Sequence, residues 1–184
     1  MTSRSSDASK KSSLLPASKP TLSEKAQFTG SHAVNIGEGA IIHPHARIRA
    51  EGGDVMIGKH SMLYERALVG TVDGGDVTIG EYVNIETGAV VEAKSVGDGT
   101  TVEVNAVVGK SAVLGRWCKV APLERVEAGE VLEDFTVVYG DGQRRTDKTT
   151  KEHKEIRDLK KEAQIKAVQV ISTMIPNFSA KWES

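Results

Sequence analysis

The sequence from Val96 to Val138 reads VGDGTTVEVNAVVGKSAVLGRWCKVAPLERVEAGEVLEDFTVV, with an aliphatic residue at every sixth position. The aliphatic residues that keep this spacing are Val96, Val102, Val108, Leu114, Val120, Val126, Leu132 and Val138. A period of six fits neither the 3.6-residue period of an α-helix nor the two-residue alternation of an amphipathic strand. It is typical of hexapeptide repeats, which form a β-helix whose coils stack along one axis.

The same spacing continues toward the N-terminus in blocks of three hexapeptides. The aliphatic residues of these blocks are Ile36, Ile42, Ile48, Ile57, Leu63, Val69, Ile79, Ile85 and Val91. Between blocks the count slips, and the segments Glu51–Asp54 and Asp73–Asp76, rich in glycine and aspartate, are inserted. If three hexapeptides make one triangular coil, such insertions should fall at a corner, where a loop does not disturb strand pairing. The sequence therefore predicts about six coils and a rod on the order of 30 Å tall, at about 4.8 Å per coil.

Composition limits the classes of protein that remain. The chain has 184 residues, a formal net charge of −1 and only 4% aromatic residues. The low charge gives no global field that would attract nucleic acid, and no apolar run is long enough to cross a bilayer. Cys118 is the only cysteine, which excludes an intrachain disulfide and fits a reducing compartment.

The sequence divides into three parts: residues 1–30, 31–142 and 143–184. The first part has eight serines, five Lys or Arg residues and two acidic residues, which predicts a disordered Ser/Lys-rich tail. A mitochondrial transit peptide is the alternative, because such peptides are rich in serine and poor in acids. The second part is the predicted β-helix, and the third is a C-terminal α-helix with its own short tail.

An amphipathic stripe predicts the C-terminal helix. It consists of Ile156, Leu159, Ala163, Ala167, Val170 and Met174, and Ile165, Val168 and Ile171 widen it at its C-terminal end. Asp147, Thr149 and Thr150 are candidate N-caps, and Pro176 ends the helix. We expect this helix to pack along one face of the rod, although it could also bind a partner. The candidate partner-facing residues are Arg144, Arg145, Val168, Ile171 and Ile175.

The positions of the histidines bear on whether this rod is an enzyme. γ-Carbonic-anhydrase-like proteins of this architecture bind a metal through three histidines, and hexapeptide acyltransferases use a histidine as general base. The histidines here are His32, His43, His45, His60 and His153, so none falls in the most regular part of the repeat. We interpret His43 and His45 as outward-facing surface residues, with a two-histidine metal site as a weaker alternative. The sequence thus predicts no catalytic residue, no bound cofactor and no metal.

Several short segments resemble one family in particular. They are IIHPHARIRAEGG at 41–53, VMIG at 55–58, LYERA at 63–67, VVYG at 137–140 followed by Arg144 and Arg145, and IPNF at 175–178. On these segments the chain is identified as a fungal-type member of the dynactin subunit 6 family. The match covers about residues 36–178. The Ser/Lys-rich tail and the short insertion at 71–76 depart from the family pattern.

The resemblance implies a left-handed parallel β-helix, an all-β solenoid; the spacing alone could not give the hand. It also implies a non-catalytic structural subunit of the dynactin pointed-end subcomplex, in the cytoplasm and on the cytoskeleton, that supports dynein-driven transport on microtubules. The implied partners are the smaller dynactin β-helix subunit, the pointed-end actin-related protein and the large zinc-motif dynactin subunit. Neither nucleic acid binding nor membrane insertion is implied. The alternative is a homotrimeric hexapeptide enzyme of the carbonic-anhydrase-like or acyltransferase type.

Overall fold

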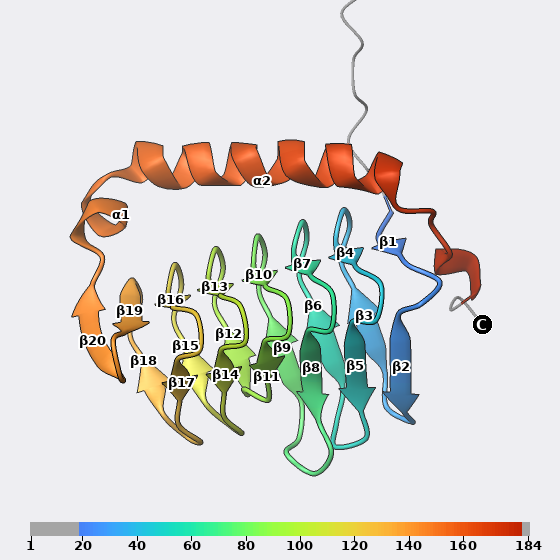
Figure 1. Cartoon of the computed structure of the whole chain (residues 1–184), viewed down its shortest axis with the longest axis horizontal. Helices are drawn as coiled ribbons and strands as arrows, with labels where there is room; N and C mark the ends of the chain where they lie inside the picture. The colour runs from blue at the N-terminus through green and yellow to red at the C-terminus, as the bar shows by residue number, and fades with distance from the viewer. Residues whose placement is uncertain (1–18, 182–184) are drawn as a thin grey trace, which may run out of the picture.

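Three parallel β-sheets form the three faces of a rod, and one long helix lies along the rod (Figure 1). The computed structural model describes residues 19–181. The rod is a left-handed parallel β-helix of about six coils, which confirms the predicted fold class. Each coil contributes one short strand to each sheet, as expected if three hexapeptides make one turn.

Sheet 1 is the face beneath the helix. Its parallel strands are β1 (Thr21–Leu22), β4 (Ile41–Ile42), β7 (Met62–Leu63), β10 (Asn84–Ile85), β13 (Thr101–Val102), β16 (Lys119–Val120) and β19 (Thr136–Tyr139). The antiparallel strand β20 (Gln143–Thr146) pairs with β19 and closes this sheet at its C-terminal end.

The other two faces have six strands each. Sheet 2 consists of β2 (Gln27–Gly30), β5 (Arg47–Ala50), β8 (Leu68–Thr71), β11 (Val90–Val91), β14 (Val107–Val108) and β17 (Arg125–Val126). Sheet 3 consists of β3 (Val34–Ile36), β6 (Val55–Ile57), β9 (Val77–Ile79), β12 (Ser95–Val96), β15 (Val113–Leu114) and β18 (Val131–Leu132).

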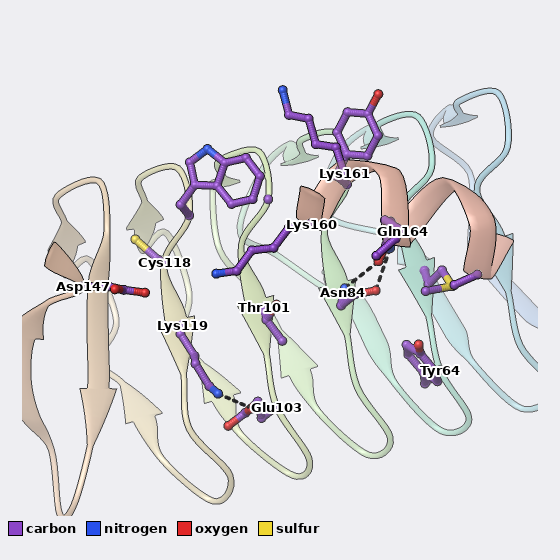
Figure 2. Close-up of a pocket in the computed structure, with 16 residues that line it drawn as sticks. Tyr64, Asn84, Thr101, Glu103, Cys118, Lys119, Asp147, Lys160, Lys161 and Gln164 are labelled. Carbon is purple, nitrogen blue, oxygen red and sulfur yellow. Dashed lines mark hydrogen bonds and ion pairs between the residues drawn. The ribbon is translucent and has the colours of Figure 1, made fainter. Parts of the chain in front are cut away.

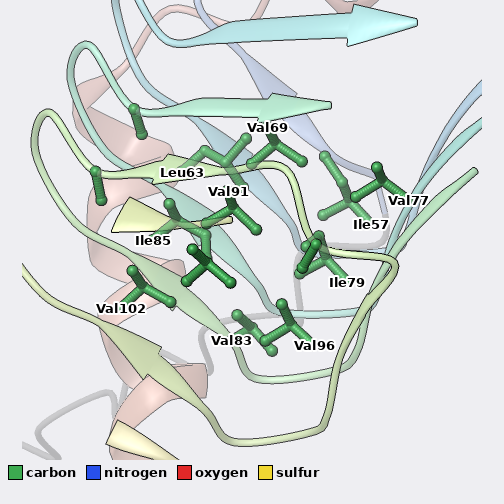
Figure 3. Close-up of a cluster of buried hydrophobic side chains, with 14 of the residues drawn as sticks. Ile57, Leu63, Val69, Val77, Ile79, Val83, Ile85, Val91, Val96 and Val102 are labelled. Carbon is green, nitrogen blue, oxygen red and sulfur yellow. The ribbon is translucent and has the colours of Figure 1, made fainter. Parts of the chain in front are cut away.

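The core is built from ladders of like residues, as the six-residue period predicts. In sheet 1 the register places Ile42 against Leu63, Leu63 against Ile85 and Ile85 against Val102. These side chains are fully buried, and Figure 3 shows Leu63, Ile85 and Val102 together with counterparts from the other two sheets. Each coil therefore buries one aliphatic side chain per face against its neighbours above and below, which removes apolar surface from water along the whole rod.

The rod begins at Thr21, ten residues before the predicted boundary at residue 31. The Thr21 amide donates to the Ala40 carbonyl at 2.8 Å, and β2 pairs with β5 along its whole length. Leu22 is buried in the core and Phe28 packs against it. Leu22 and Phe28 are six residues apart, but this single repeat was too short to outweigh the Ser- and Lys-rich composition around it. The part of the tail prediction that concerns residues 1–18 lies outside the described residues.

The segment after residue 142 is also not helical from its start. After β20, helix α1 (Lys148–Glu152) and helix α2 (Lys154–Met174) follow, with a short 3-10 turn at Ser179–Lys181. Asp147 is the N-cap of α1, as predicted, and its side chain accepts from the Thr150 amide at 3.0 Å. His153 has an extended backbone and separates the two helices. Neither helix within residues 19–181 combines the length and apolar character needed to cross a membrane.

The orientation of α2 differs from the prediction. Most of the predicted narrow stripe, here called the α2 stripe (Ile156, Leu159, Ala163, Ala167, Val170 and Met174), lies to the side of the contact with the rod, although Ala167 packs on it. Leu159 is 63% exposed and Met174 is 74% exposed, whereas Val168, on another face of the helix, is 1% exposed. The reason is that sheet 1 presents polar residues such as Asn84 beneath much of α2, so a mixed helix face with Gln164 fits it better than an apolar one. Hydrophobic periodicity therefore placed the centre of the apolar face wrongly, and only Ala167 and the widening residues Val168 and Ile171 meet the rod's apolar cluster.

Helix α2 spans the rod from one end to the other (Figure 1). Its 21 residues correspond to about 31 Å at 1.5 Å per residue, close to six spacings of about 4.8 Å. The chain then returns to the first coil: the Leu22 amide donates to Asn177 Oδ1 at 3.1 Å, and the Phe178 amide donates to the Leu22 carbonyl at 2.9 Å. Sheet 1 is thus covered at β1 by this returning segment and at β19 by β20.

Candidate interaction surfaces

An apolar cluster binds the C-terminal half of α2 to the rod. Val168 lies buried against Ile41 and Met62 on the outer face of sheet 1, and Ile171 and Ile175 pack half-buried on the same cluster. The sequence assigned Val168, Ile171 and Ile175 to a partner-facing surface. For Val168 this was wrong, because its side chain is buried against the chain's own rod. Ile171 and Ile175 have only part of their surface left for a partner.

Cationic side chains hold the N-terminal half of α2 against one corner of the rod. Tyr82, Trp117 and Phe135 occupy equivalent positions at the corner between sheets 3 and 1, each with a positive φ, and are called the aromatic corner. Lys161 Nζ lies 5.4 Å from the Tyr82 ring centroid and 5.8 Å from that of Trp117. Arg157 Cζ lies 5.6 Å from the Phe135 centroid. These are cation–π distances, so the polar residues of α2 have a specific role in docking the helix.

Glycine leaves the space that the indole of Trp117 needs. A Cβ on Gly99 would lie 2.5 Å from the Trp117 ring, and Gly99 itself has a φ of +68°. The side chain of Trp117 therefore folds over the coil below, beside Lys161. Gly99 is thus part of the packing at this corner.

A groove of about 460 Å³ runs between α2 and the outer face of sheet 1 (Figure 2). Its lining includes Tyr64, Thr101 and Glu103 from the sheet and Ala163 and Ala167 from the helix.

Polar side chains cross the floor of this groove. Gln164 Nε2 donates to Asn84 Oδ1 at 2.8 Å, and Lys119 Nζ pairs with Glu103 Oε1 at 2.8 Å. Glu86 follows Ile85 in the register between Tyr64 and Glu103. Burial, and then the neighbouring charge of Glu103, raise the pKa of the Glu86 carboxyl. Glu103 in the lining is thus paired with a lysine, and Glu86, its neighbour in the ladder, lies in the opposing fields of Glu103 and Lys119.

His43 is not the exposed residue that the sequence predicted. Its residue exposure is 8%; the ring stacks on Tyr64 at a centroid distance of 4.8 Å, and Nδ1 lies 3.3 Å from Glu65 Oε1. The reason is that the His43 side chain points away from the core, as expected for the residue after Ile42, but is covered there by Tyr64 of the next coil. His45 is exposed, as predicted. The two rings therefore belong to different environments and do not converge.

The remaining histidines are also dispersed. His60 stacks on Tyr82 with a centroid distance of 5.4 Å, His32 Nδ1 lies 3.0 Å from the Ala50 carbonyl oxygen, and His153 Nδ1 lies 3.0 Å from Glu155. Within residues 19–181, no three His, Cys, Asp or Glu side chains are grouped so that they could hold a metal ion. Each histidine is engaged with its own local neighbours.

The single thiol is buried in the wall of the rod. Cys118 Sγ donates to the Glu133 carbonyl at 3.1 Å, and the Cys118 amide donates to Thr100 Oγ1 at 3.0 Å. Burial raises the pKa of the Cys118 thiol to about 11. A thiol in this state is protonated at neutral pH and is a poor nucleophile.

Arg144 and Arg145 lie on β20, and both are exposed. Arg144 Nε and Nη2 donate to the two carboxylate oxygens of Glu130 at 3.0 and 3.1 Å, and Nη2 also reaches the Arg125 carbonyl at 3.4 Å. Arg145 lies over the Tyr139 ring at 5.7 Å. Arg144 therefore caps the edge of β17, and a partner-facing role for either arginine stays a prediction.

The two ends of the rod expose strand edges. In the described chain, sheets 2 and 3 end in β2 and β3 at one end and in β17 and β18 at the other. Near the latter end Leu123 is 78% exposed and Val131 is 69% exposed. Exposed edges with nearby apolar side chains are typical of surfaces on which another β-structure adds.

Comparison with known proteins relates this rod to dynactin subunit 6. No family model matches the chain. Dynactin subunit 6 of Danio rerio is 34% identical over 119 residues, which cover 58% of this chain and 61% of that protein. That of Xenopus tropicalis is 29% identical over 118 residues, covering 58% and 59%, and that of Nematostella vectensis is 29% identical over 128 residues, covering 64% and 68%. The chain thus spans about three fifths of the length of the first two relatives.

Solved structures share the fold at low sequence identity. A hexapeptide transferase family protein from Anaplasma phagocytophilum aligns with a TM-score of 0.64 and 19% identity, covering 84% of this chain and 91% of that one. The acetyltransferase domain of PglB from Neisseria gonorrhoeae aligns with a TM-score of 0.53 and 15% identity, covering 70% and 58%. At these identities the likeness concerns architecture alone.

The relatives named here are from Danio rerio, Xenopus tropicalis and Nematostella vectensis, so the fungal-type assignment stays a prediction. The resemblance itself, first seen in the segments around His43 and after Val137, is confirmed by these matches. This hexapeptide-repeat rod is a relative of the dynactin subunit 6 proteins.

Proposed function

We propose that this chain is a non-catalytic structural subunit of the pointed-end subcomplex of dynactin, and that it thereby supports dynein-driven cargo transport on microtubules. The observation that carries the proposal is the similarity to proteins named dynactin subunit 6 in four organisms. A role in that complex corresponds to a location in the cytoplasm and on the cytoskeleton.

The proposed partners are the smaller dynactin β-helix subunit, the pointed-end actin-related protein and the large zinc-motif dynactin subunit. The edge of β18 supports the first of these, because a second β-helix can continue sheet 3 there, whereas Arg144 caps the neighbouring edge of β17. The exposed Leu123 and Val131 would lie close to that junction. The assembly is then a hetero-oligomer, with neither nucleic acid nor membrane insertion involved.

The side chains support a scaffold in preference to an enzyme. His43 and His60 are stacked on tyrosines, and Cys118 holds its proton up to about pH 11. A thiol that keeps its proton at neutral pH is a poor nucleophile, and the His43 side chain, at 8% residue exposure, offers a substrate little access. The alternative function is a carbonic-anhydrase-like or acyltransferase homotrimer, and the rod shares only its fold with a hexapeptide transferase family protein.

One purification experiment distinguishes a dynactin subunit from a homotrimeric enzyme. The full chain, tagged and expressed in its own cells, should co-purify with the other dynactin subunits and with dynein at a fixed stoichiometry. The purified chain alone should contain far less than one zinc ion per chain. A homotrimer by light scattering, with about one metal ion per chain and no dynactin subunits in the pull-down, would contradict the proposal.

Charge reversal tests the two arginines on β20. The double variant Arg144→Glu, Arg145→Glu should reduce co-purification of dynactin subunits while the circular dichroism spectrum stays that of the parent chain. Lys59→Glu, an exposed change on another side of the rod, is the matched control. Equal recovery of partners with the double variant and the control would remove these arginines from the interface.

A further inference from the structure

Arg144 reaches across the C-terminal end of the rod. In the antiparallel pair of β19 and β20 it lies opposite Val138, whose side chain is in the core, so the Arg144 side chain leaves β20 on the core side. Its Nε and Nη2 donate to the two carboxylate oxygens of Glu130 at 3.0 and 3.1 Å, and Nη2 also donates to the Arg125 carbonyl at 3.4 Å. One side chain therefore connects the end of sheet 1 with the last strand of sheet 2 and with the turn that leads into β18.

Two carboxylates of the last coil hold this arrangement in place. Glu130 Oε2 also accepts from the Glu127 amide at 2.9 Å, so a backbone group orients the carboxylate that meets Arg144. The Glu124 carboxylate accepts from the two backbone amides at 141–142, at 3.0 and 2.9 Å, which fixes the turn between β19 and β20. A bidentate arginine–carboxylate pair adds a defined geometry to the attraction of the two charges. Arg144, Glu130 and Glu124 are here called the Arg144 cap.

Arg145 adjoins Arg144 but lies on the other face of β20, because side chains alternate along a strand. It pairs with Val137 and lies over the Tyr139 ring of its own hairpin at 5.7 Å. Both arginines belong to the same exposed strand and carry the same charge. A difference between their variants therefore reports the cap and not the net charge of the chain.

The two ends of the rod differ in how well their cores are covered. At the capped end, where β20 turns back beside β19, the inward-facing Val126, Leu132 and Val138 are all buried (Figure 1). At the other end Val34 and Ile36, which pack on the core from β3, are only half-buried. The described chain thus has one end whose core is closed and one whose core is covered in part.

A rod of this kind without a cap can stack on copies of itself. The first and last coils have the same three-sided outline, so β2 and β3 of one copy could continue β17 and β18 of another as parallel strands. Such a head-to-tail contact does not close on itself and extends into a filament. At the capped end an incoming β2 would have to displace Arg144 from the Arg125 carbonyl and bury the charges of Arg144 and Glu130 against an apolar core. Burial of charged groups that lose their partners is costly, so the cap disfavours this contact.

We propose that the Arg144 cap prevents copies of this chain from stacking end to end. The cap acts by closing the core of the last coil and by occupying the edge of β17, the strand on which a second copy would begin to pair. The inference concerns self-association alone. It does not rest on membership of dynactin, since it follows from the contacts at this end of the rod.

Matched alanine variants of the full chain test the proposal. Arg144→Ala removes the cap, whereas Arg145→Ala makes the same change in net charge one residue away. Sedimentation velocity at increasing protein concentration measures self-association. Arg144→Ala should self-associate at least about 10-fold more tightly than the parent chain, whereas Arg145→Ala should stay within about twofold of it. Small-angle X-ray scattering gives the direction of association, because stacked rods lengthen while the radius of gyration of their cross-section stays constant.

A charge exchange shows whether the ion pair itself is responsible. Arg144→Glu combined with Glu130→Arg restores opposite charges across the same gap and should return self-association to within about threefold of the parent chain. Circular dichroism and thermal unfolding establish that each variant is folded. If Arg144→Ala loses its last coil, Glu130→Gln takes its place, because it retains the arginine and removes only the charge that the arginine meets. Glu133→Gln, an exposed change in the same coil, is then the control.

Three results would overturn the proposal. A folded Arg144→Ala chain that associates no more than the parent chain would show that the cap blocks nothing. Equal association of Arg144→Ala and Arg145→Ala would attribute the effect to net charge. A thicker cross-section at unchanged length would place the contact on a side of the rod and not at its end. Absence of dynactin subunits from a pull-down would contradict the proposed function but leave all of these measurements unaffected.

Discussion

Two valines on α2 provide the sharpest test of how the helix is seated. Val168 is 1% exposed and lies against Ile41 and Met62, whereas Val170, two residues later, is 53% exposed. Both are valines in the middle of the same helix, so Val168→Ala and Val170→Ala make the same chemical change in different surroundings. Any difference between them reports the packing of α2 on sheet 1 and not the identity of the residue.

The expected magnitudes follow from burial. Removing two buried methyl groups from Val168 costs about 1.6 kcal/mol at about 0.8 kcal/mol each. The cavity that remains between α2 and the rod raises the total to about 2–3 kcal/mol. At Val170 the lost contacts are few and alanine favours the helix, so the free energy of unfolding should change by less than about 0.5 kcal/mol.

Hydrogen–deuterium exchange of α2 and thermal unfolding measure the two effects together. Val168→Ala should lower the protection of amides in the C-terminal half of α2 and reduce the melting temperature by about 4–12 °C, at about 2–4 °C per kcal/mol for a domain of this size. Val170→Ala should leave both unchanged. If Val170→Ala proves the more destabilising change, α2 lies on its apolar stripe and the described orientation is wrong.

Three further changes probe other parts of the rod. Gly99→Ala should cost about 1–3 kcal/mol more in thermal or urea unfolding than Gly129→Ala, because both glycines have positive φ but only a Cβ at Gly99 meets Trp117; equal costs would show that the indole does not need that space. Cys118 should react with iodoacetamide at pH 8 at least about 100-fold more slowly than a free thiol. Its stabilising contribution should be complete below pH 9 and lost between pH 9 and about 11, since the folded chain keeps the proton that the unfolded chain releases; rapid labelling of the folded chain would contradict this. Glu86→Gln should not lower the melting temperature at pH 7, because burial and Glu103 already disfavour the charged carboxylate; a clear decrease would mean that the carboxylate has a stabilising partner.

The repeat could be predicted from the sequence because one physical rule determines it. Each coil admits one large side chain per face, so Ile42, Leu63 and Ile85 stand in one ladder and their spacing is visible in the chain. The first coil was missed since Leu22 and Phe28 provide only a single interval of six. The N-cap at Asp147 was predictable for the same reason as the repeat, because it depends on local chemistry.

The seating of α2 and the surroundings of His43 could not be predicted in this way. Both depend on which side chains a given coil presents on the outer surface of the rod, and the residues that meet there are far apart in the sequence. Gln164 meets Asn84 across 80 residues, and His43 meets Glu65 across one coil. A periodicity search measures how apolar a helix face is, but it does not measure how polar the receiving surface is.

The return of the chain to its first coil has a consequence for how the rod unfolds. A linear array of repeats, in which each contacts only its neighbours, can lose its terminal coils one at a time. Here the segment at Asn177 and Phe178 is bonded to Leu22, and α2 connects it to the last coil. The first coil therefore cannot fray unless this C-terminal segment, which α2 connects to the last coil, is also released. The first and last coils are therefore linked through α2, and all coils should unfold together in one cooperative transition.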